Sequence, residues 1–253
     1  MRLSDLRDSF VLRRFFNDPW ALLRRRVKPG GPRTIDLGLR SGGALRLRAG
    51  TLDRHIAHRI FARDEYRLDA IAPRSLRVVV DVGAHIGLFC ARVAPLTARV
   101  IACEPSPENF ALLDLNTRSF PWVELHREAV AARSGVRALL GTLEPSAHSF
   151  HGPAGAPSVQ VSCVTLEGLF ERERIERCDI LKLDCEGAEH EILHGAPLGL
   201  LQRIAQVRTE VHPSPNPDWT LASAAERLRA AGHDVETVGD PRRPGRGWIF
   251  SER

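Results

Sequence analysis

The chain contains only two lysines, Lys28 and Lys182, although it has 36 basic residues in total, so its positive charge is almost entirely arginine. This composition is typical of a GC-rich bacterial genome. The arginines behind the net charge of +5 are spread along the chain and do not gather in one segment. Because a nucleic-acid partner needs basic residues clustered on one face, no nucleic acid is expected as a partner.

Paired cysteines and long apolar runs are also missing. No segment approaches the roughly 18 uninterrupted apolar residues that a membrane-spanning helix needs, and the arginine-bearing N-terminus lacks an apolar signal core. The cysteines form no C-x-x-C pair, which fits reduced core residues of a cytoplasmic protein. They are Cys90, Cys103, Cys163, Cys178 and Cys185.

From Val78 onward, short β-branched runs alternate with helical patterns. This alternation predicts an α/β fold, a Rossmann-like and mostly parallel sheet of about seven strands with helices on both faces. The segments "DVETVG" and "WIFSE" near the end predict an antiparallel hairpin added to that sheet. The segments "VRALLG" and "SVQVSCVTL" predict extra strands or a flap. Strands are expected at 78–82, 99–103, 123–127, 179–184 and 204–212, and helices at 87–95, 106–118, 188–194 and 221–231.

Residues 1–73 are expected to form an N-terminal extension to a main domain at 74–253. The extension begins with a basic amphipathic helix, and a β-hairpin follows in "TIDLGLRSGGALRLRAG". A lead-in helix is then predicted at 55–71, closed by Pro73. The extension offers a surface for oligomer formation, while its first 33 residues lie outside the predicted cofactor unit.

The stretch "VVVDVGAHIGLF" lacks the third glycine of the G-x-G-x-x-G fingerprint that brings a backbone close to a pyrophosphate. It has Asp81 before Gly83, with Gly87 four positions later. An acid here repels a pyrophosphate but suits a cationic ligand. The pattern therefore disfavours a nicotinamide oxidoreductase and favours S-adenosylmethionine, which carries an ammonium and a sulfonium.

The second strand ends in "ACEPSPENF", where Glu104 occupies the position of the ribose-binding acid of dinucleotide sites. Ser106 and Pro107 have the residue types of a helix N-cap and first helical position. Two acids on consecutive strands, Asp81 and Glu104, are thus predicted to flank one crevice at the carboxyl edge of the sheet.

The segments "DVGAHIGLF", "ACEPSPENFALLDLN", "VTLEGLF" and "LKLDCEGAEHEILHGA" resemble the FkbM family of S-adenosylmethionine-dependent O-methyltransferases, as does "RIFARDEY" upstream. The resemblance spans roughly residues 45–212. His85 departs from the family, which usually has asparagine there. The resemblance implies an amino-acid end of the cofactor surrounded by Asp81, Gly83, Ala84, His85 and Gly87, a ribose on Glu104, an adenosine near Ser106 and Asn109, and an adenine wall at Glu128 and Ala129.

The chemical end of the site is expected around Asp184, which ends the fourth strand beside the methyl donor. An Asn/Asp-Pro-Pro-aromatic turn, typical of amino-methylating enzymes of nucleic acids, is missing at this position, which favours oxygen as the acceptor atom. An alkyl hydroxyl is a weak acid, so a base is needed, and His212 at the end of the fifth strand is the best candidate. Lys182 is predicted to pair with Glu210 or, as an alternative, to act as a neutral catalytic lysine.

A divalent metal is an alternative to a protein base, because carboxylates and an imidazole suit Mg²⁺ or Mn²⁺. The predicted function is methyl transfer from S-adenosylmethionine to a hydroxyl of a small molecule. The resemblance implies a sugar, glycan or polyketide-type acceptor. An N- or peptide-methyltransferase and an inactive S-adenosylmethionine-binding regulatory protein remain as alternatives. The candidate metal ligands are Asp184, Glu186, Glu210 and His212.

Overall fold

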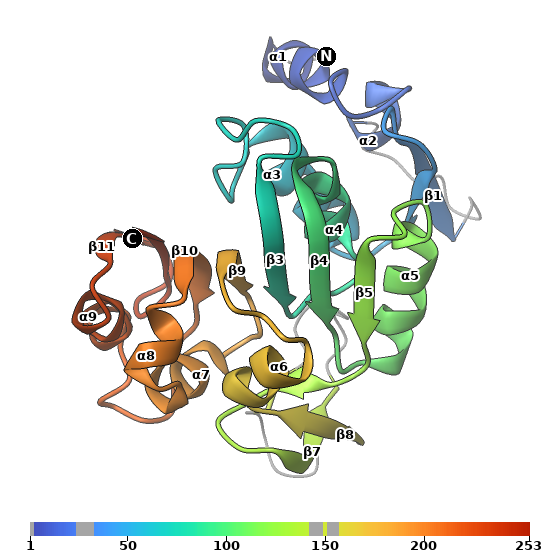
Figure 1. The fold of residues 1–253 in the computed structure, drawn as a ribbon. Helices are drawn as coiled ribbons and strands as arrows, with labels where there is room; N and C mark the ends of the chain where they lie inside the picture. Colours follow the sequence, from blue (N-terminus) through green and yellow to red (C-terminus); the bar gives the residue numbers. More distant parts are fainter. Residues whose placement is uncertain (1–2, 24–32, 142–148, 151–156) are drawn as a thin grey trace.

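The computed structural model describes residues 3–23, 33–141, 149–150 and 157–253 (Figure 1). Its central sheet has seven strands in the order β11-β12-β10-β9-β3-β4-β5. Only β12 runs against its neighbours, pairing antiparallel with both β10 and β11, as the C-terminal hairpin pattern predicted. The strands are β3 (Leu76–Val82), β4 (Thr97–Cys103), β5 (Val123–His126), β9 (Cys178–Leu183), β10 (Ile204–Val211), β11 (Asp234–Gly239) and β12 (Gly247–Glu252).

Successive side chains of each strand point to opposite faces of the sheet, so the core is divided into two layers. Val79 and Val100 are buried on the side of helices α3, α4 and α5. Val80 and Ile101 are buried on the side of α6, α7, α8 and α9. The predicted α/β fold, a mostly parallel seven-stranded sheet with helices on both faces, is confirmed. The helices are α3 (Asp53–Ala62), α4 (Leu88–Val93), the 3₁₀ turn η1 (Ala94–Leu96), α5 (Pro107–Thr117), α6 (Leu166–Arg172), α7 (Glu189–Gly195), α8 (Leu198–Leu201) and α9 (Leu221–Ala230).

The N-terminal segment packs into the first of these layers. It forms α1 (Leu3–Leu12), α2 (Pro19–Leu23) and the predicted hairpin of β1 (Thr34–Gly38) and β2 (Ala44–Arg48). Leu12, Phe16 and Leu22 are almost fully buried in the same cluster as Val79. The basic residues 24–32, which belong to the predicted extension, lie outside the described part of the chain. The division at residue 73 stays a prediction.

The lead-in helix is shorter than the predicted 55–71, because α3 ends at Ala62. Asp64 then has a φ of 48°, and its carboxylate accepts the backbone N–H groups of Leu68 and Asp69 at 2.7 and 2.9 Å. A short side chain that binds nearby backbone donors competes with helix formation. Residues 63–71 therefore form a folded loop, and the helical prediction for them is wrong.

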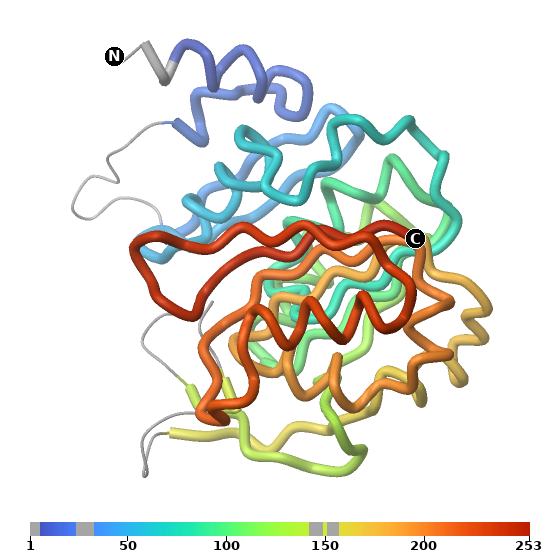
Figure 2. Tube along the Cα trace, turned by 90° about the vertical axis from the view of Figure 1, so that its left-hand side faces the viewer, coloured from blue at the N-terminus to red at the C-terminus, as the bar shows by residue number. Residues whose placement is uncertain are grey.

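A separate three-stranded sheet, in the order β6-β8-β7, forms the predicted flap. Figures 1 and 2 show this flap and α1 at opposite ends of the molecule, with the flap beyond the carboxyl ends of β3, β4 and β5. Helices α2, α6 and α8 were not expected from the sequence. No helix among the described residues is both long and apolar enough to cross a membrane. The flap strands are β6 (Ala129–Val130), β7 (Gly135–Leu140) and β8 (Ser158–Val164).

Candidate active site

The loop from Gly83 to Gly87 lies at the carboxyl edge of the sheet, directly after β3. Gly83, His85 and Gly87 have positive φ values of 75°, 52° and 84°. A Cβ on Gly83 would lie 2.0 Å from the carbonyl oxygen of Asp184, so only glycine lets this loop touch the end of β9. The Ala84 carbonyl accepts the N–H of Gly87 at 2.9 Å and closes the turn. Gly83 thus permits the close approach to the end of β9, and Gly87 leads directly into α4.

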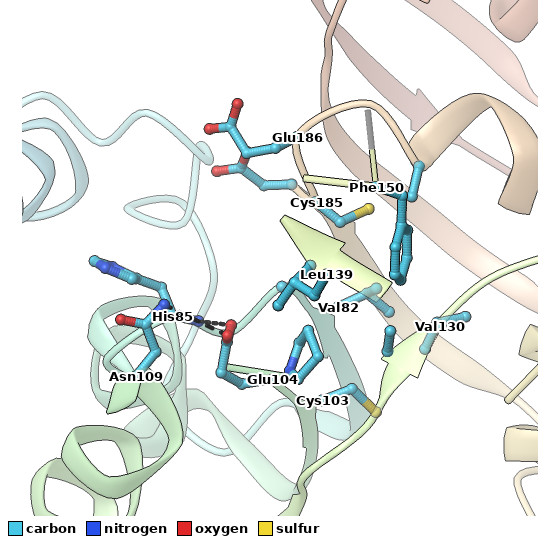
Figure 3. Close-up of a pocket in the computed structure, with 15 residues that line it drawn as sticks. Val82, His85, Cys103, Glu104, Asn109, Val130, Leu139, Phe150, Cys185 and Glu186 are labelled. Carbon is cyan, nitrogen blue, oxygen red and sulfur yellow. Dashed lines mark hydrogen bonds between the residues drawn. The ribbon is translucent and has the colours of Figure 1, made fainter. Parts of the chain in front are cut away.

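A cavity opens beside this loop, between the ends of the central strands and the flap (Figure 3). One end is polar and contains Glu104, and the other is formed by the segment after β9. Apolar side chains from β7 and from Phe150 close the side between them. The lining includes Gly83, His85, Glu104, Asn109, Ala129, Leu139, Phe150, Asp184 and Glu186.

Glu104 is 5% exposed and is held by its neighbours from two sides. Its carboxylate accepts the backbone N–H of His85 at 2.9 Å (Figure 3). It also accepts the backbone N–H of Ser106 at 2.9 Å and the Asn109 amide at 3.4 Å. Burial raises the pKa of Glu104 to about 7, although these hydrogen bonds act in the opposite direction. The carboxylate is therefore fixed in place and close to its titration point at neutral pH.

Asp81 does not face this cavity. It has no exposed surface, and its carboxylate forms an ion pair with Lys182 at 2.9 Å and accepts the Cys90 thiol at 3.1 Å. Lys182 also donates to the Gly83 carbonyl at 2.6 Å. The predicted pairing of Lys182 with Glu210 is wrong, because the register places Lys182 opposite Asp81 on β3. Asp81 and Lys182 therefore support the glycine loop from behind, and a role for Asp81 at the cofactor's amino-acid end stays a prediction.

Two further predicted cofactor residues have structural partners. Glu128 pairs with Arg172 of α6 and is not among the described lining residues, whereas Ala129 and Leu139 are. Ser106 caps α5, as its sequence position predicted, through its hydroxyl oxygen and the backbone N–H of Asn109.

Asp184, Glu210 and His212 form a cluster at the other end of the site. Each offers one polar atom, and these atoms all lie within 4.8 Å of one another. Both oxygens of Glu210 already accept guanidinium groups, from Arg246 at 2.5 Å and from Arg59 at 3.2 Å. Burial acts to raise the pKa of Glu210, but Arg246 and Arg59 outweigh it and lower that pKa.

Tyr66 orients Asp184 in this cluster. Its hydroxyl donates to the Asp184 carboxylate at 3.0 Å, while its buried ring contacts Phe89 and Trp248 edge-on. Burial raises the pKa of Asp184, with nearby Lys182 opposing the change. Asp184 is therefore a proton acceptor of raised affinity, held in one orientation.

Both ring nitrogens of His212 face a carboxylate, but only Nδ1 is hydrogen-bonded among the described residues. Nδ1 lies 3.0 Å from the carboxylate of fully buried Glu189, and Nε2 lies 3.5 Å from that of Glu186. Burial favours the neutral ring, but Glu189 and Glu186 outweigh it and raise the pKa of His212 to about 10. Burial likewise raises the pKa of Glu186, to about 7. His212 is thus protonated at neutral pH, which opposes its predicted role as the base, while Glu186 titrates in the useful range.

The same contacts bear on the predicted divalent metal. The two guanidinium groups on Glu210 donate to both of its oxygens, which a metal would need, and Nδ1 of His212 is hydrogen-bonded to Glu189. This donor set therefore does not fit Mg²⁺ or Mn²⁺ in this arrangement.

Several site residues were missed by the sequence reasoning. Arg59 and Tyr66 belong to the segment "RIFARDEY", which carried a resemblance signal but no assigned role. Arg48, Arg246 and Phe150 had no signal, because each is far from the glycine loop in sequence and reaches the site only through folding.

Residues 81–235 match the methyltransferase FkbM domain family, and this segment contains the glycine loop, Glu104 and the whole cluster around Asp184. The chain belongs to the FkbM methyltransferase family. The family match confirms the resemblance and assigns the fold and the methyltransferase class of enzyme.

Two curated relatives are similar in sequence to part of this FkbM methyltransferase. AglP of Haloferax volcanii, described as a hexuronic acid methyltransferase, is 29% identical over 145 residues, covering 55% of this chain and 58% of AglP. AmbE of Pseudomonas aeruginosa, described as an AMB antimetabolite synthetase, is 27% identical over 217 residues, covering 69% of this chain and 10% of AmbE. The chain thus spans just over half of AglP and a tenth of AmbE.

Solved structures match this chain at lower sequence identity. The FkbM methyltransferase of Methylobacillus flagellatus KT gives a TM-score of 0.48 at 13% identity, covering 70% of this chain and 43% of that chain. A putative transferase from Pyrococcus horikoshii gives 0.48 at 14% identity, covering 88% of this chain and 72% of that chain. The fold assignment rests on the strand order and the family match.

Proposed function

We propose that this FkbM methyltransferase transfers the methyl group of S-adenosylmethionine to a hydroxyl of a small molecule. The observation that carries the proposal is a single cavity with Glu104 at one end and Asp184 and Glu186 at the other. A carboxylate at the first end suits ribose hydroxyls. Carboxylates at the second end suit a sulfonium and the proton of an acceptor.

We place the cofactor along this cavity. Glu104 would hold its ribose, Ala129 and Leu139 would face its adenine, and Gly83 and His85 would face its amino-acid end, since all of these residues line the cavity. The sulfonium would then lie near Asp184, whose pKa burial raises, and its positive charge would favour the ionised carboxylate.

Methyl transfer is an in-line displacement, so the protein has to align the acceptor and remove its proton. We assign the proton to Glu186, which lines the cavity and has a pKa near 7. Protonated His212, 3.5 Å away, favours the ionised form of Glu186 and is itself held by Glu189. His212 thus acts on the base electrostatically.

The acceptor class is a sugar or a related polyhydroxylated molecule. The family and the description of AglP as a hexuronic acid methyltransferase support this choice. We place the reaction in the cytoplasm, because the five cysteines are unpaired, which fits a reducing compartment. The proposal includes neither a nucleic-acid partner nor a metal.

The test combines binding and turnover. Calorimetry with S-adenosylmethionine should show micromolar binding, and NAD should show none. Transfer of a labelled methyl group to hexuronic acids and to their deoxy analogues should occur only where the hydroxyl is present, and EDTA should leave the rate unchanged. Tight NAD binding without a response to S-adenosylmethionine would refute the proposal, and activity restored to a chelated enzyme by Mg²⁺ would refute its metal-free form.

The assignment of Glu186 as the base is tested by comparing two variants. Glu186→Gln should lower turnover by roughly 10²- to 10⁴-fold, the range for general base catalysis, with little change in cofactor affinity. Glu191→Gln, on nearby α7 and paired with Arg137 outside the cavity, is the control and should keep the wild-type rate. Equal rates for both variants would remove Glu186 from the reaction.

A further inference from the structure

Arg48, the last residue of β2, reaches from the N-terminal hairpin to the cofactor loop. Its guanidinium forms a two-pronged pair with fully buried Asp53, with Nε–Oδ2 and Nη2–Oδ1 both 2.9 Å. The remaining N–H groups contact the Nε2 of His85 and the Oδ1 of Asn109, each at 2.8 Å. Asp53 thus fixes the guanidinium plane, and the plane reaches two residues that line the cavity.

This contact fixes the hydrogen-bonding state of His85. A guanidinium can only donate, so Nε2 must accept, and the ring is the neutral tautomer with its proton on Nδ1. His85 has a φ of 52°, a conformation that costs energy for a non-glycine residue and persists only when its surroundings hold it. Arg48 supplies such a hold from outside the loop.

Two of the three side-chain partners of Arg48, His85 and Asn109, also touch Glu104. The backbone N–H of His85 donates to Oε2 of Glu104 at 2.9 Å, and the Asn109 amide donates to Oε1 at 3.4 Å. Each of the two carboxylate oxygens is therefore connected to Arg48 through one intermediate residue. The orientation of Asn109 follows as well, since its Oδ1 accepts from Arg48 and its Nδ2 is left to donate.

The hairpin is attached to the same loop by its backbone. Asn116 of α5 accepts the N–H of Arg46 at 2.7 Å and donates both to the Arg46 carbonyl at 3.1 Å and to the Ile86 carbonyl at 2.7 Å. One amide thus joins β2 to the glycine loop. Since this attachment does not involve the Arg48 side chain, the hairpin can stay docked when Arg48 is changed.

We propose that Arg48 is a positioning residue for the cofactor, acting through His85 and Asn109 to hold the glycine loop and Glu104 in their binding geometry. The matched FkbM segment begins only at Asp81, so this role adds an element outside the family match to the site. The inference rests on the proposed cofactor site.

The experiment measures S-adenosylmethionine affinity by calorimetry in the full chain, which needs no acceptor. Arg48→Met should weaken binding about tenfold, as expected for loss of two hydrogen bonds that order the site. Arg48→Lys should not restore affinity, because an ammonium cannot bind Asp53, His85 and Asn109 together. Arg46→Met is the control, since Arg46 lies on the same strand and its side chain pairs only with exposed Asp36 among the described residues.

A double-mutant cycle separates positioning from general stability. In a His85→Ala background, Arg48→Met should weaken binding clearly less than in the wild type, because part of the route is already removed. Nitrogen NMR of His85 should show the Nδ1–H tautomer in the wild type and its loss in Arg48→Met. Unchanged affinity in folded Arg48→Met, or full additivity with no tautomer change, would overturn the inference. A wild type that binds no S-adenosylmethionine would instead refute the proposed function.

Discussion

At the residue scale, the charge states in this site follow from burial and partners more than from residue type. Glu104 and Glu186 are ordinary acids whose pKa values burial raises to about 7. His212 differs, because Glu189 and Glu186 keep it protonated despite its burial. The residue type that is usually the proton acceptor thus becomes the cation, and a carboxylate becomes the candidate base.

Glu104 provides the first prediction. Glu104→Ala should weaken S-adenosylmethionine binding by about 1.5–3 kcal/mol, the range for hydrogen bonds to a charged group. Ribose hydroxyls bind the ionised carboxylate, so affinity should fall as the pH drops from 8 to 6, with a proton released on binding. Calorimetry in two buffers of different ionisation enthalpy measures that proton. Exposed Glu108→Ala, in the first turn of α5, is the control, and a pH-independent affinity in the wild type would contradict the assignment.

The pair of His212 and Glu189 provides the second prediction. The pKa of His212 is raised to about 10, so its contribution to stability is complete below about pH 6.5 and is lost as the pH rises through 10. The free energy of unfolding should therefore decrease between pH 6.5 and 10. Denaturant unfolding should show a smaller decrease for His212→Gln, whereas exposed His55→Gln should behave like the wild type. Equal slopes for the two variants would contradict a charged His212.

At the scale of secondary-structure elements, the N-terminal segment contributes differently along its length. The segment from α1 to α2 buries Leu12, Phe16 and Leu22 in the core, at the end of the molecule away from the flap. The hairpin and the loop after α3 instead deliver Arg48 and Tyr66 to the site. The first part therefore affects stability, and the second part affects the chemistry of the site.

A truncation separates these contributions. A chain that starts at Thr34 should bind S-adenosylmethionine within about twofold of the full chain but unfold at lower temperature, because large apolar side chains lose their cover. Phe16→Ala in the full chain should reproduce the stability loss, at about 3–5 kcal/mol. Calorimetric binding and thermal unfolding measure the two effects. A folded Thr34 truncation that has lost the cofactor would contradict the division.

At the scale of the whole molecule, the proposed cofactor position connects parts that are distant in sequence. The cavity is lined by the loop after β3, by α5, by the flap strand β7 and by the segment after β9. A ligand that bridges these elements stabilises the folded state by mass action.

The thermal unfolding temperature should therefore rise when S-adenosylmethionine is added. At about 100 times its dissociation constant, S-adenosylmethionine should add about 2.7 kcal/mol, which corresponds to a shift of roughly 5–10 °C for a chain of this size. The demethylated product should give a similar shift, and NAD at the same concentration should give none. A shift with NAD alone would contradict the cofactor assignment. Scanning fluorimetry is sufficient for this comparison.

The sequence by itself determined the layered sheet, its C-terminal hairpin, the glycine loop and the position of Glu104. These features depend on local patterns: strand and helix periodicity, a glycine that must adopt positive φ, and an acid at a strand end. The helix predicted at 55–71 failed after Ala62 because the Asp64 side chain competes for backbone donors, which periodicity does not reveal.

Only the tertiary structure decided which charges meet. A period of two assigns Lys182 to a face but not to a partner, and the register places it against Asp81, while Glu210 faces Arg59 and Arg246. The protonation of His212 and the reach of Arg48 to His85 likewise depend on contacts between segments far apart in the chain. Electrostatic energies depend on distance and burial in three dimensions, so these pairings and pKa values follow from the packing and not from sequence spacing.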